Sequence, residues 1–205
     1  MIGAGFADPV RSAQAAFRTV LEATSRPGMV RAIVADMMPP LPLSPAVAAI
    51  ALTLCDQDTP VWLDAPLRAS PEVASWLRFH CGTRIVEDPQ AASFAFAADP
   101  QALPSFDSFS LGNADYPDRS TTIVLRVDSF HAGPELILEG PGIKTRQSFR
   151  AAPLPADIVP RLTANRCLFP RGVDLILASA NEIAALPRSV RLADAGASGE
   201  GATCM

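Results

Sequence analysis

Lysine and histidine are scarce in this sequence, and their scarcity limits the chemistry that the chain can carry out. Of the 17 basic residues only Lys144 is a lysine, and there are two histidines, His80 and His131. Any Schiff-base mechanism would therefore have to use Lys144. The four cysteines are widely separated and form no Cys-x-x-Cys pair, so the sequence indicates neither a zinc site nor a disulfide framework.

The motifs of common enzyme classes are also missing. The sequence has no Gly-x-Ser-x-Gly nucleophile elbow, no Walker phosphate loop, no Gly-x-Gly-x-x-Gly dinucleotide motif and no paired histidines at metal-ligand spacing. These absences argue against most enzymes that work alone, and no metal is expected.

Long apolar runs and a basic charge balance are absent as well. No apolar stretch approaches the roughly 20 residues of a membrane span, and the N-terminus lacks the basic and apolar regions of a signal peptide. The net charge of −4 and the pI near 5.1 argue against a basic face for nucleic acid. We therefore expect a soluble, cytoplasmic protein with neither nucleic acid nor membrane as a partner.

The sequence does contain enough apolar material for one sizeable core. It has 205 residues, of which 49% are hydrophobic, and this length is marginal for two domains of typical size. We expect a single domain over residues 1–192. Residues 193–205 are small and polar without an apolar period, which predicts a flexible C-terminal tail.

The segment from Pro45 to Gly82 predicts a helix, a strand and a second helix. Residues 45–55 are apolar almost all round, so the first helix must be covered on most sides. Val61-Trp62-Leu63 predicts a short buried strand. The second helix, over residues 71–81, has Ser70 as its N-cap, and Gly82 follows its last residue.

The remaining chain predicts further strands and helices around this segment. Thr121 to Val127 and Glu135 to Glu139 are expected to form an antiparallel hairpin. The segments 83–86 and 93–97 are strands that either pair with each other or follow one another. The other expected elements include a helix from Pro9 through Leu21, capped by Asp8 and followed by a turn over residues 25–28. A helix over 155–166, with Ile158, Val159 and Leu162 pointing inward, and strands over 29–34, 173–177 and 182–186 complete the set. Together they predict an α/β fold, a layered domain whose mixed sheet is flanked by helices.

Two features offer candidate chemistry, each with a structural alternative. His80 lies on the apolar stripe of the second helix, while Arg78 points elsewhere. The histidine is either a half-buried residue near a helix end or a phosphate-binding or acid–base group shared with Arg78. Likewise Gly140-Pro141-Gly142 either makes a turn or binds phosphate through its backbone amides.

Five blocks of sequence, taken in order, resemble a known family. They begin with Phe17-Arg18 and Leu21 before Ser25-Arg26-Pro27-Gly28, and the rest are Leu52-Thr53-Leu54 with Asp56 and Asp58-Thr59-Pro60-Val61-Trp62-Leu63; Leu77-Arg78-Phe79-His80; Gly140-Pro141-Gly142-Ile143; and Phe169-Pro170-Arg171-Gly172-Val173-Asp174-Leu175-Ile176-Leu177 followed by Leu186-Pro187-Arg188. On these blocks, which span residues 17–188, the chain resembles PhnH, the H subunits of the bacterial carbon–phosphorus lyase system.

The resemblance implies a subunit of the cytoplasmic assembly that replaces the adenine of ATP with an alkylphosphonate, giving a ribose 1-phosphonate 5-triphosphate. Subunits of this family are not known to perform chemistry alone. The family implies a reduced version of the pyridoxal-phosphate-dependent transferase fold, a homodimer in isolation, and sister subunits as partners. It also implies that the pyridoxal cofactor is absent, which suits a chain whose only lysine, Lys144, follows a glycine-rich turn.

The blocks also suggest which residues bind substrate or partners. Arg78, His80, Arg119 and Arg171 are candidates for one anion-binding surface, because arginine offers paired donors to phosphate or phosphonate oxygens. Asp174 is expected to form an ion pair that orients Arg171. Taken alone, each arginine has a structural or interface role as its alternative, and Asp56 and Asp58 are expected to serve turns rather than catalysis.

Three hypotheses about function remain open at this point. The leading one is a structural or jointly catalytic subunit of a phosphonate-processing complex. The second is a stand-alone phosphate- or phosphonate-binding protein, or a small transferase, that uses an arginine cluster. The third is a pyridoxal enzyme built on Lys144.

Overall fold

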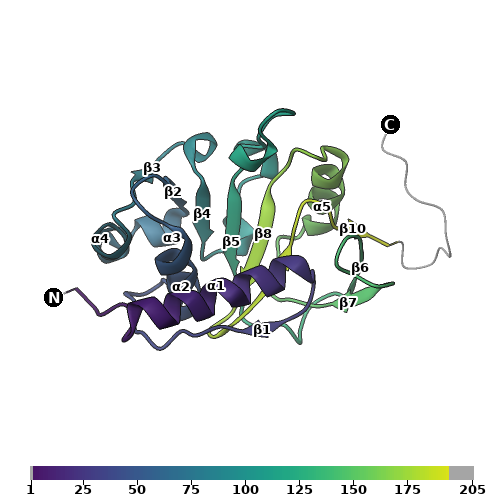
Figure 1. The fold of residues 1–205 in the computed structure, drawn as a ribbon. Coiled ribbons are helices and arrows are strands. Elements are labelled where there is room, and N and C mark those ends of the chain that lie inside the picture. The colour runs from purple at the N-terminus through teal and green to yellow at the C-terminus, as the bar shows by residue number, and fades with distance from the viewer. Residues whose placement is uncertain (1, 194–205) are drawn as a thin grey trace.

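The computed structural model describes residues 2–193 and builds them around a seven-stranded mixed β-sheet (Figure 1). From one edge to the other, its strands are β1 (Arg31–Ala32), β9 (Glu182–Leu186), β8 (Asp174–Ala178), β5 (Thr122–Arg126), β4 (Phe94–Ala97), β2 (Val61–Leu63) and β3 (Ile85–Val86). The five strands from β8 to β3 are parallel, whereas β9 is antiparallel to both of its neighbours. The predicted α/β class with a mixed sheet is confirmed. The predicted tail lies outside the described residues, apart from Ala193.

Helices cover both faces of this sheet. Described helices are α1 (Pro9–Ser25), α2 (Pro45–Leu54), α3 (Ala65–Arg68), α4 (Pro71–Cys81) and α5 (Ile158–Cys167), with short 3-10 turns η1 (Pro89–Ala91), η2 (Pro100–Ala102), η3 (Phe106–Ser108) and η4 (Pro117–Arg119). One hydrophobic cluster joins the first four helices to one face of the sheet. A second cluster joins α5 and the η3 region to the opposite face.

Strand β5 shows how the sequence divides residues between the two faces. Successive side chains of a strand point to opposite faces of its sheet. Val124 accordingly joins the cluster of α1, α2 and α4, while Ile123 and Leu125 join the cluster of α5. All three side chains are fully buried, so both faces of this strand are covered, as the apolar sequence requires.

The helix signals in the sequence were accurate because they act locally. Asp8 caps α1, since its carboxylate accepts a hydrogen bond from the backbone N–H of Arg11 at 3.1 Å. Helix α2 is buried along Ala46–Ala51, as its apolar surface predicted. Helix α4 ends at Gly82, which has a left-handed φ of +69°. Ser70 stands at the N-cap position of α4, but its hydroxyl bonds the Glu72 side chain and not the helix backbone.

The predicted hairpin between residues 121–127 and 135–139 is wrong. Strand β5 pairs with β4 and β8 in the main sheet. Strand β6 (Leu136–Glu139) instead lies in a separate three-stranded sheet, between β10 (Arg191–Leu192) and β7 (Gln147–Phe149). Strand β5 is buried on both faces, which is typical of a central strand in a parallel sheet. Such a strand pairs with a strand on each side, and these partners need not be its neighbours in sequence.

Two further expectations are resolved by the packing. The segments 83–86 and 93–97 do not pair with each other, because β2 lies between β3 and β4. Val159 was expected to point inward, but it is 47% exposed, since α5 begins at Ile158 and places Ile158 and Leu162 against the sheet. No helix within residues 2–193 combines the length and the apolar character that crossing a membrane requires.

Candidate functional site

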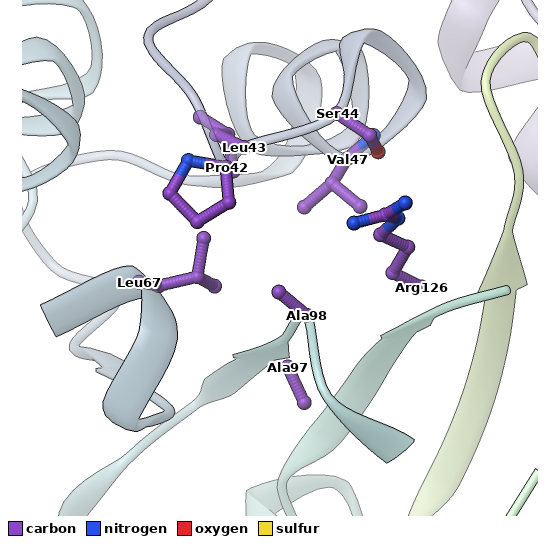
Figure 2. Close-up of a pocket in the computed structure, with 8 residues that line it drawn as sticks. All are labelled: Pro42, Leu43, Ser44, Val47, Leu67, Ala97, Ala98 and Arg126. Atoms are coloured by element: carbon purple, nitrogen blue, oxygen red, sulfur yellow. The ribbon is translucent and has the colours of Figure 1, made fainter. Parts of the chain in front are cut away.

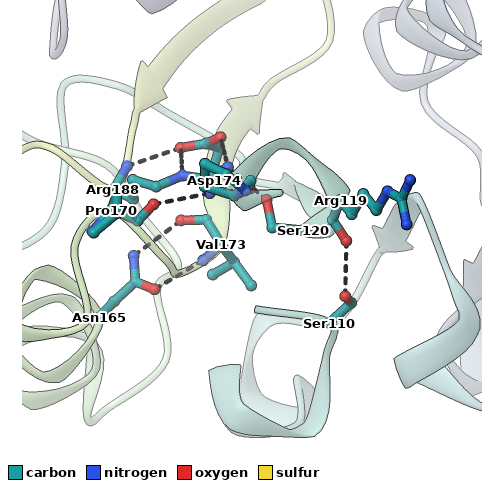
Figure 3. A network of polar contacts seen from close by, with 9 residues as sticks. Ser110, Arg119, Ser120, Asn165, Pro170, Val173, Asp174 and Arg188 are labelled. Atoms are coloured by element: carbon teal, nitrogen blue, oxygen red, sulfur yellow. Dashed lines mark hydrogen bonds and ion pairs between the residues drawn. The ribbon is translucent and has the colours of Figure 1, made fainter. Parts of the chain in front are cut away.

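Arg188 is the centre of a polar network at the amino ends of β5 and β8 (Figure 3). It follows β9, and its guanidinium holds the Asp174 carboxylate through two contacts, from Nε at 3.1 Å and from Nη2 at 2.5 Å. The backbone N–H of Arg188 donates to the same carboxylate at 2.9 Å. Such paired, charge-assisted contacts give arginine a fixed orientation.

The remaining donors of Arg188 join two neighbouring loops. Nη2 also donates to the Ser120 hydroxyl at 2.5 Å, and Nη1 donates to the carbonyl oxygens of Pro117 at 2.6 Å and Pro170 at 3.4 Å. The loop before β5 and the loop before β8 are thereby held together. All five guanidinium N–H groups have protein acceptors, so none is left for a substrate.

The expected ion pair between Arg171 and Asp174 is therefore wrong. Asp174 is held by Arg188, which lies 14 positions further along the chain and reaches it because β9 returns antiparallel beside β8. Among the described residues Arg171 makes no ion pair, and its side chain is exposed. Leu186-Pro187-Arg188 was among the blocks that carry the family resemblance, and this was the signal that could have identified Arg188.

A second polar pair secures the turn before β8. The side chain of Asn165, buried in α5, donates to the carbonyl of Val173 and accepts from its N–H, both at 2.9 Å. This arrangement satisfies buried polar groups and fixes the end of α5 against the start of β8. Figure 3 shows it directly below the Arg188 network.

Arg119 lies nearby but does not join the network. Its guanidinium stacks on the exposed ring of Tyr116, 4.2 Å from the centroid, and Figure 3 shows its side chain extending away from Arg188. Its backbone carbonyl accepts a separate hydrogen bond from the Ser110 hydroxyl at 2.8 Å.

Arg78 and His80 lie on α4, at the β3 end of the sheet (Figure 1). His80 Nε2 is 2.9 Å from the carbonyl oxygen of Gly3, which also accepts from Trp76 Nε1 at 3.1 Å. His80 therefore anchors the N-terminal segment, as expected of a half-buried histidine. The structure does not bring Arg78 and His80 together with Arg119 and Arg171, so the four candidates do not form one anion-binding surface.

Gly142 has a packing role. Its φ of +82° is left-handed, and a Cβ added there would collide with the carbonyl oxygen of Ser25 and touch Pro27. The 140–142 turn thus packs on the turn from Ser25 to Gly28, and two of the blocks that carry the resemblance meet at this point. The contact supports the turn interpretation of Gly140-Pro141-Gly142.

Lys144 lies on the exposed connection between β6 and β7, in the smaller sheet. A Schiff-base lysine is usually activated by burial or by a neighbouring cation. The exposed position of Lys144 offers no burial of its amine.

At the carboxyl end of β2 the structure places a buried acid, Asp64, which the sequence analysis did not single out. Its carboxylate accepts from the backbone N–H groups of Leu67 at 3.1 Å, Ala98 at 2.7 Å and Asp99 at 2.9 Å. Burial raises the pKa of Asp64 above its ordinary value of 3.8, against the opposing effect of these hydrogen bonds. The signal for its cap role was an aspartate directly after a buried strand, two positions before a proline.

Ligands of open α/β sheets usually bind at the carboxyl ends of the strands, and a crevice does open there (Figure 2). Its lining is almost wholly apolar, with Arg126 as the single charged residue. Its empty volume of about 160 Å³ includes open solvent, so the space that the protein itself encloses is smaller than this. The lining residues are Pro42, Leu43, Ser44, Val47, Leu67, Ala97, Ala98 and Arg126.

Metal chemistry has no visible basis in the described part of the chain. Within residues 2–193 no three His, Cys, Asp or Glu side chains converge to hold a metal ion. Asp56 serves a turn, since its carboxylate accepts from the N–H of Asp58 at 2.9 Å and the Thr59 hydroxyl at 3.2 Å. This agrees with the turn role expected of Asp56, and Asp58 contributes its backbone N–H to the same turn.

Comparison with known proteins gives a consistent result along the whole described chain. The family model described as bacterial phosphonate metabolism protein (PhnH) matches residues 4–193. The subunit PhnH of alpha-D-ribose 1-methylphosphonate 5-triphosphate synthase from Rhizobium meliloti strain 1021 is 42% identical over 187 residues, covering 91% of this chain and 93% of the relative. A Stutzerimonas stutzeri protein named as a candidate C-P lyase subunit, HtxG, is 33% identical over 181 residues, covering 87% and 85%.

Proposed function

Because this chain belongs to the bacterial phosphonate metabolism protein (PhnH) family, we propose that it is a subunit of the synthase that makes a ribose 1-phosphonate 5-triphosphate. In this reaction an alkylphosphonate displaces the adenine of ATP. The observation that carries the proposal is the 42% identity to a named synthase subunit over nearly the full length of both chains. The second relative, named for the C-P lyase, supports the same pathway.

Within the assembly, the chain is a structural or jointly catalytic subunit with no activity of its own. Three features of its surface support this role. The arginines expected to bind anions are dispersed, the donors of Arg188 are all used by protein acceptors, and the crevice at the carboxyl ends of the strands is small and apolar. An enzyme that worked alone would need a larger pocket with converging polar groups.

The domain is a reduced pyridoxal-phosphate-dependent transferase fold that works without the cofactor. A mostly parallel sheet with helices on both faces supports the fold assignment. The exposed position of Lys144 supports cofactor independence, because no other lysine is present in the sequence. The chain acts in the cytoplasm. In isolation it forms a homodimer, and in the assembly it binds its sister subunits.

Omission of this subunit from a reconstituted synthase tests the proposal. The sister subunits are incubated with ATP and methylphosphonate, with and without this chain, and released adenine is measured by chromatography. Adenine release that depends on the chain is the expected result. Release at the same rate without the chain would contradict the assignment, as would turnover of the phosphonate by the purified chain alone.

The rival function is a stand-alone phosphate- or phosphonate-binding protein. Calorimetry of the isolated chain with ATP and with methylphosphonate decides between the two. Micromolar binding that is abolished by Arg171→Ala or Arg78→Ala would favour the rival. We expect no heat of binding, since these two side chains lie on separate parts of the molecule.

A further inference from the structure

Helix α1 carries an apolar seam that no other described element covers. Val10 is 67% exposed, Phe17 44% and Leu21 52%, and Gln14 between them is exposed as well. The opposite side of the helix is buried against the core, at Ala16, Val20 and Ala23. Figure 1 shows α1 lying across the front of the molecule, on the outside of its helix layer.

The spacing of this seam is that of a helix–helix contact. Positions 10, 14, 17 and 21 follow one another at intervals of four, three and four residues, which is the repeat of the core positions in paired helices. Singly exposed apolar residues are normal on a protein surface, but three in one such row are not scattered. Phe17 and Leu21 also belong to the blocks that carry the family resemblance, and their exposed side chains are not part of the hydrophobic core of the described chain.

The charges beside the seam are mainly basic. Arg11 and Arg18 occupy the positions that flank one side of the row. Among the described residues Arg18 has no ion-pair partner, and the contact of Arg11 with Asp8 is long, at 3.7 Å, and solvent-exposed. Glu22, the nearby acid, already faces Arg31 at 3.4 Å. A partner on this seam therefore meets the charge of Arg18, which no described acid neutralises, and that of Arg11, which is held only in an exposed pair.

A second copy of α1 does not match these charges. In an antiparallel pair about a two-fold axis, Arg11 of one copy would lie against Arg18 of the other. In a parallel pair neither arginine would meet an acid, because the other flank of the row holds Ala13 and the buried Val20. Flanking charges of paired helices decide which partner is chosen, and here they disfavour self-association.

We propose that the seam of α1 is the docking site for an amphipathic helix of a sister subunit, with an apolar row against Val10, Phe17 and Leu21 and acidic residues against Arg11 and Arg18. The inference rests on the proposed function, because it requires a multi-subunit assembly. It identifies which surface of this chain binds a partner and describes the chemistry of the segment that binds there.

A glutamate placed in the seam tests the proposal. Phe17→Glu is co-expressed with the sister subunits, and assembly is measured by size-exclusion chromatography with light scattering. We expect affinity to fall by about tenfold or more, since a central apolar anchor is lost and a buried charge is added. Val159→Glu on α5 is the matched control, because Val159 has a similar exposure of 47% and lies outside the seam. Circular dichroism and thermal unfolding check that both variants are folded.

Arg18→Glu tests the charge complementarity separately. Binding should weaken by about tenfold at low salt, and the difference from wild type should shrink as ionic strength rises. Unchanged binding of both Phe17→Glu and Arg18→Glu would overturn the proposal. It would also be overturned if the isolated chain were a dimer that Phe17→Glu converts to a monomer, because a second copy would then cover the seam. If the wild-type chain fails to join the sister subunits at all, the proposed function falls with it, which is a different result from an assembly that is indifferent to the variants.

Discussion

Arg171 and Arg188 have the same side chain and opposite roles, and their neighbours decide which role each takes. Arg188 lies where β9 and two loops converge, and its side chain is only 13% exposed. Arg171 extends from the adjacent loop into solvent. Both residues are arginines within the blocks that carry the family resemblance, so the sequence did not show which of them is structural and which is exposed to solvent.

Replacement of Arg188 should destabilise the fold. In Arg188→Ala the half-buried Asp174 carboxylate loses its counter-charge, and the loops at Pro117 and Pro170 lose their common donor. We expect the free energy of unfolding in urea to fall by about 3 kcal/mol. Arg171→Ala is the control and should change it by less than about 0.5 kcal/mol. Equal effects of the two substitutions would refute the structural role of Arg188.

The pKa values of three carboxyl groups should be shifted in different directions. Burial raises the pKa of Asp64 above 3.8, so its contribution to stability falls as the pH rises through that raised pKa. The Arg161 guanidinium holds the pKa of Asp157 below 3.8, and Arg146 holds that of Glu139 below 4.5. Those two carboxylates stabilise the fold at pH values above their ordinary pKa, and this stabilisation is lost as the pH falls through their lowered pKa. Carbon NMR of the carboxyl groups measures the three midpoints, and a midpoint for Asp64 at or below 3.8 would show that its hydrogen bonds outweigh its burial, contrary to this prediction.

Among the elements, the contact between two turns explains a glycine that sequence reasoning had left with two interpretations. Gly142 approaches the Ser25 carbonyl so closely that a Cβ does not fit. At Gly82, at the end of α4, a Cβ would make only ordinary contact with Gln57, so only the left-handed φ requires glycine there. The close approach by itself accounts for glycine at position 142. The approach depends on two segments that are more than 100 residues apart in sequence.

Alanine at these two glycines should therefore have unequal costs. Gly82→Ala should lower the free energy of unfolding by roughly 1 kcal/mol, the cost of a left-handed φ in a residue with a Cβ. Gly142→Ala should cost about 3 kcal/mol or more, because strain and collision with backbone add. Urea unfolding of both variants measures the difference. If the two variants were equally stable, the packing explanation of Gly142 would be untenable.

For the whole molecule, the position of the single lysine bears most directly on mechanism. Lys144 lies in the smaller sheet, outside the strands that build the main one. The protein as a whole thus offers a mostly parallel sheet with no lysine in it, together with an exposed apolar seam on α1.

Lys144→Ala should leave the reconstituted synthase active. We expect adenine release within about twofold of the wild-type rate, because the exposed amine lacks the burial that activates a Schiff-base lysine. Incubation of the chain with pyridoxal phosphate and borohydride should likewise give no stable adduct that depends on Lys144. Loss of activity together with such an adduct would restore the pyridoxal hypothesis.

The sequence by itself determined the local elements and the family. Asp8 and Gly82 mark helix ends through their own backbone and side-chain chemistry, and the apolar surface of residues 45–55 forces that helix into the core. Such signals act over a few residues, so they can be recognised from the sequence alone. The ordered blocks likewise identified the family that the comparisons then showed.

Only the tertiary structure decided which distant segments meet. It placed β5 between two parallel neighbours instead of in a hairpin, gave Asp174 to Arg188 instead of Arg171, and separated Arg78 and His80 from the other candidates. The physical reason is that strand pairing and ion pairing depend on the packing of the whole core. The energies of alternative partners differ only once that core is assembled.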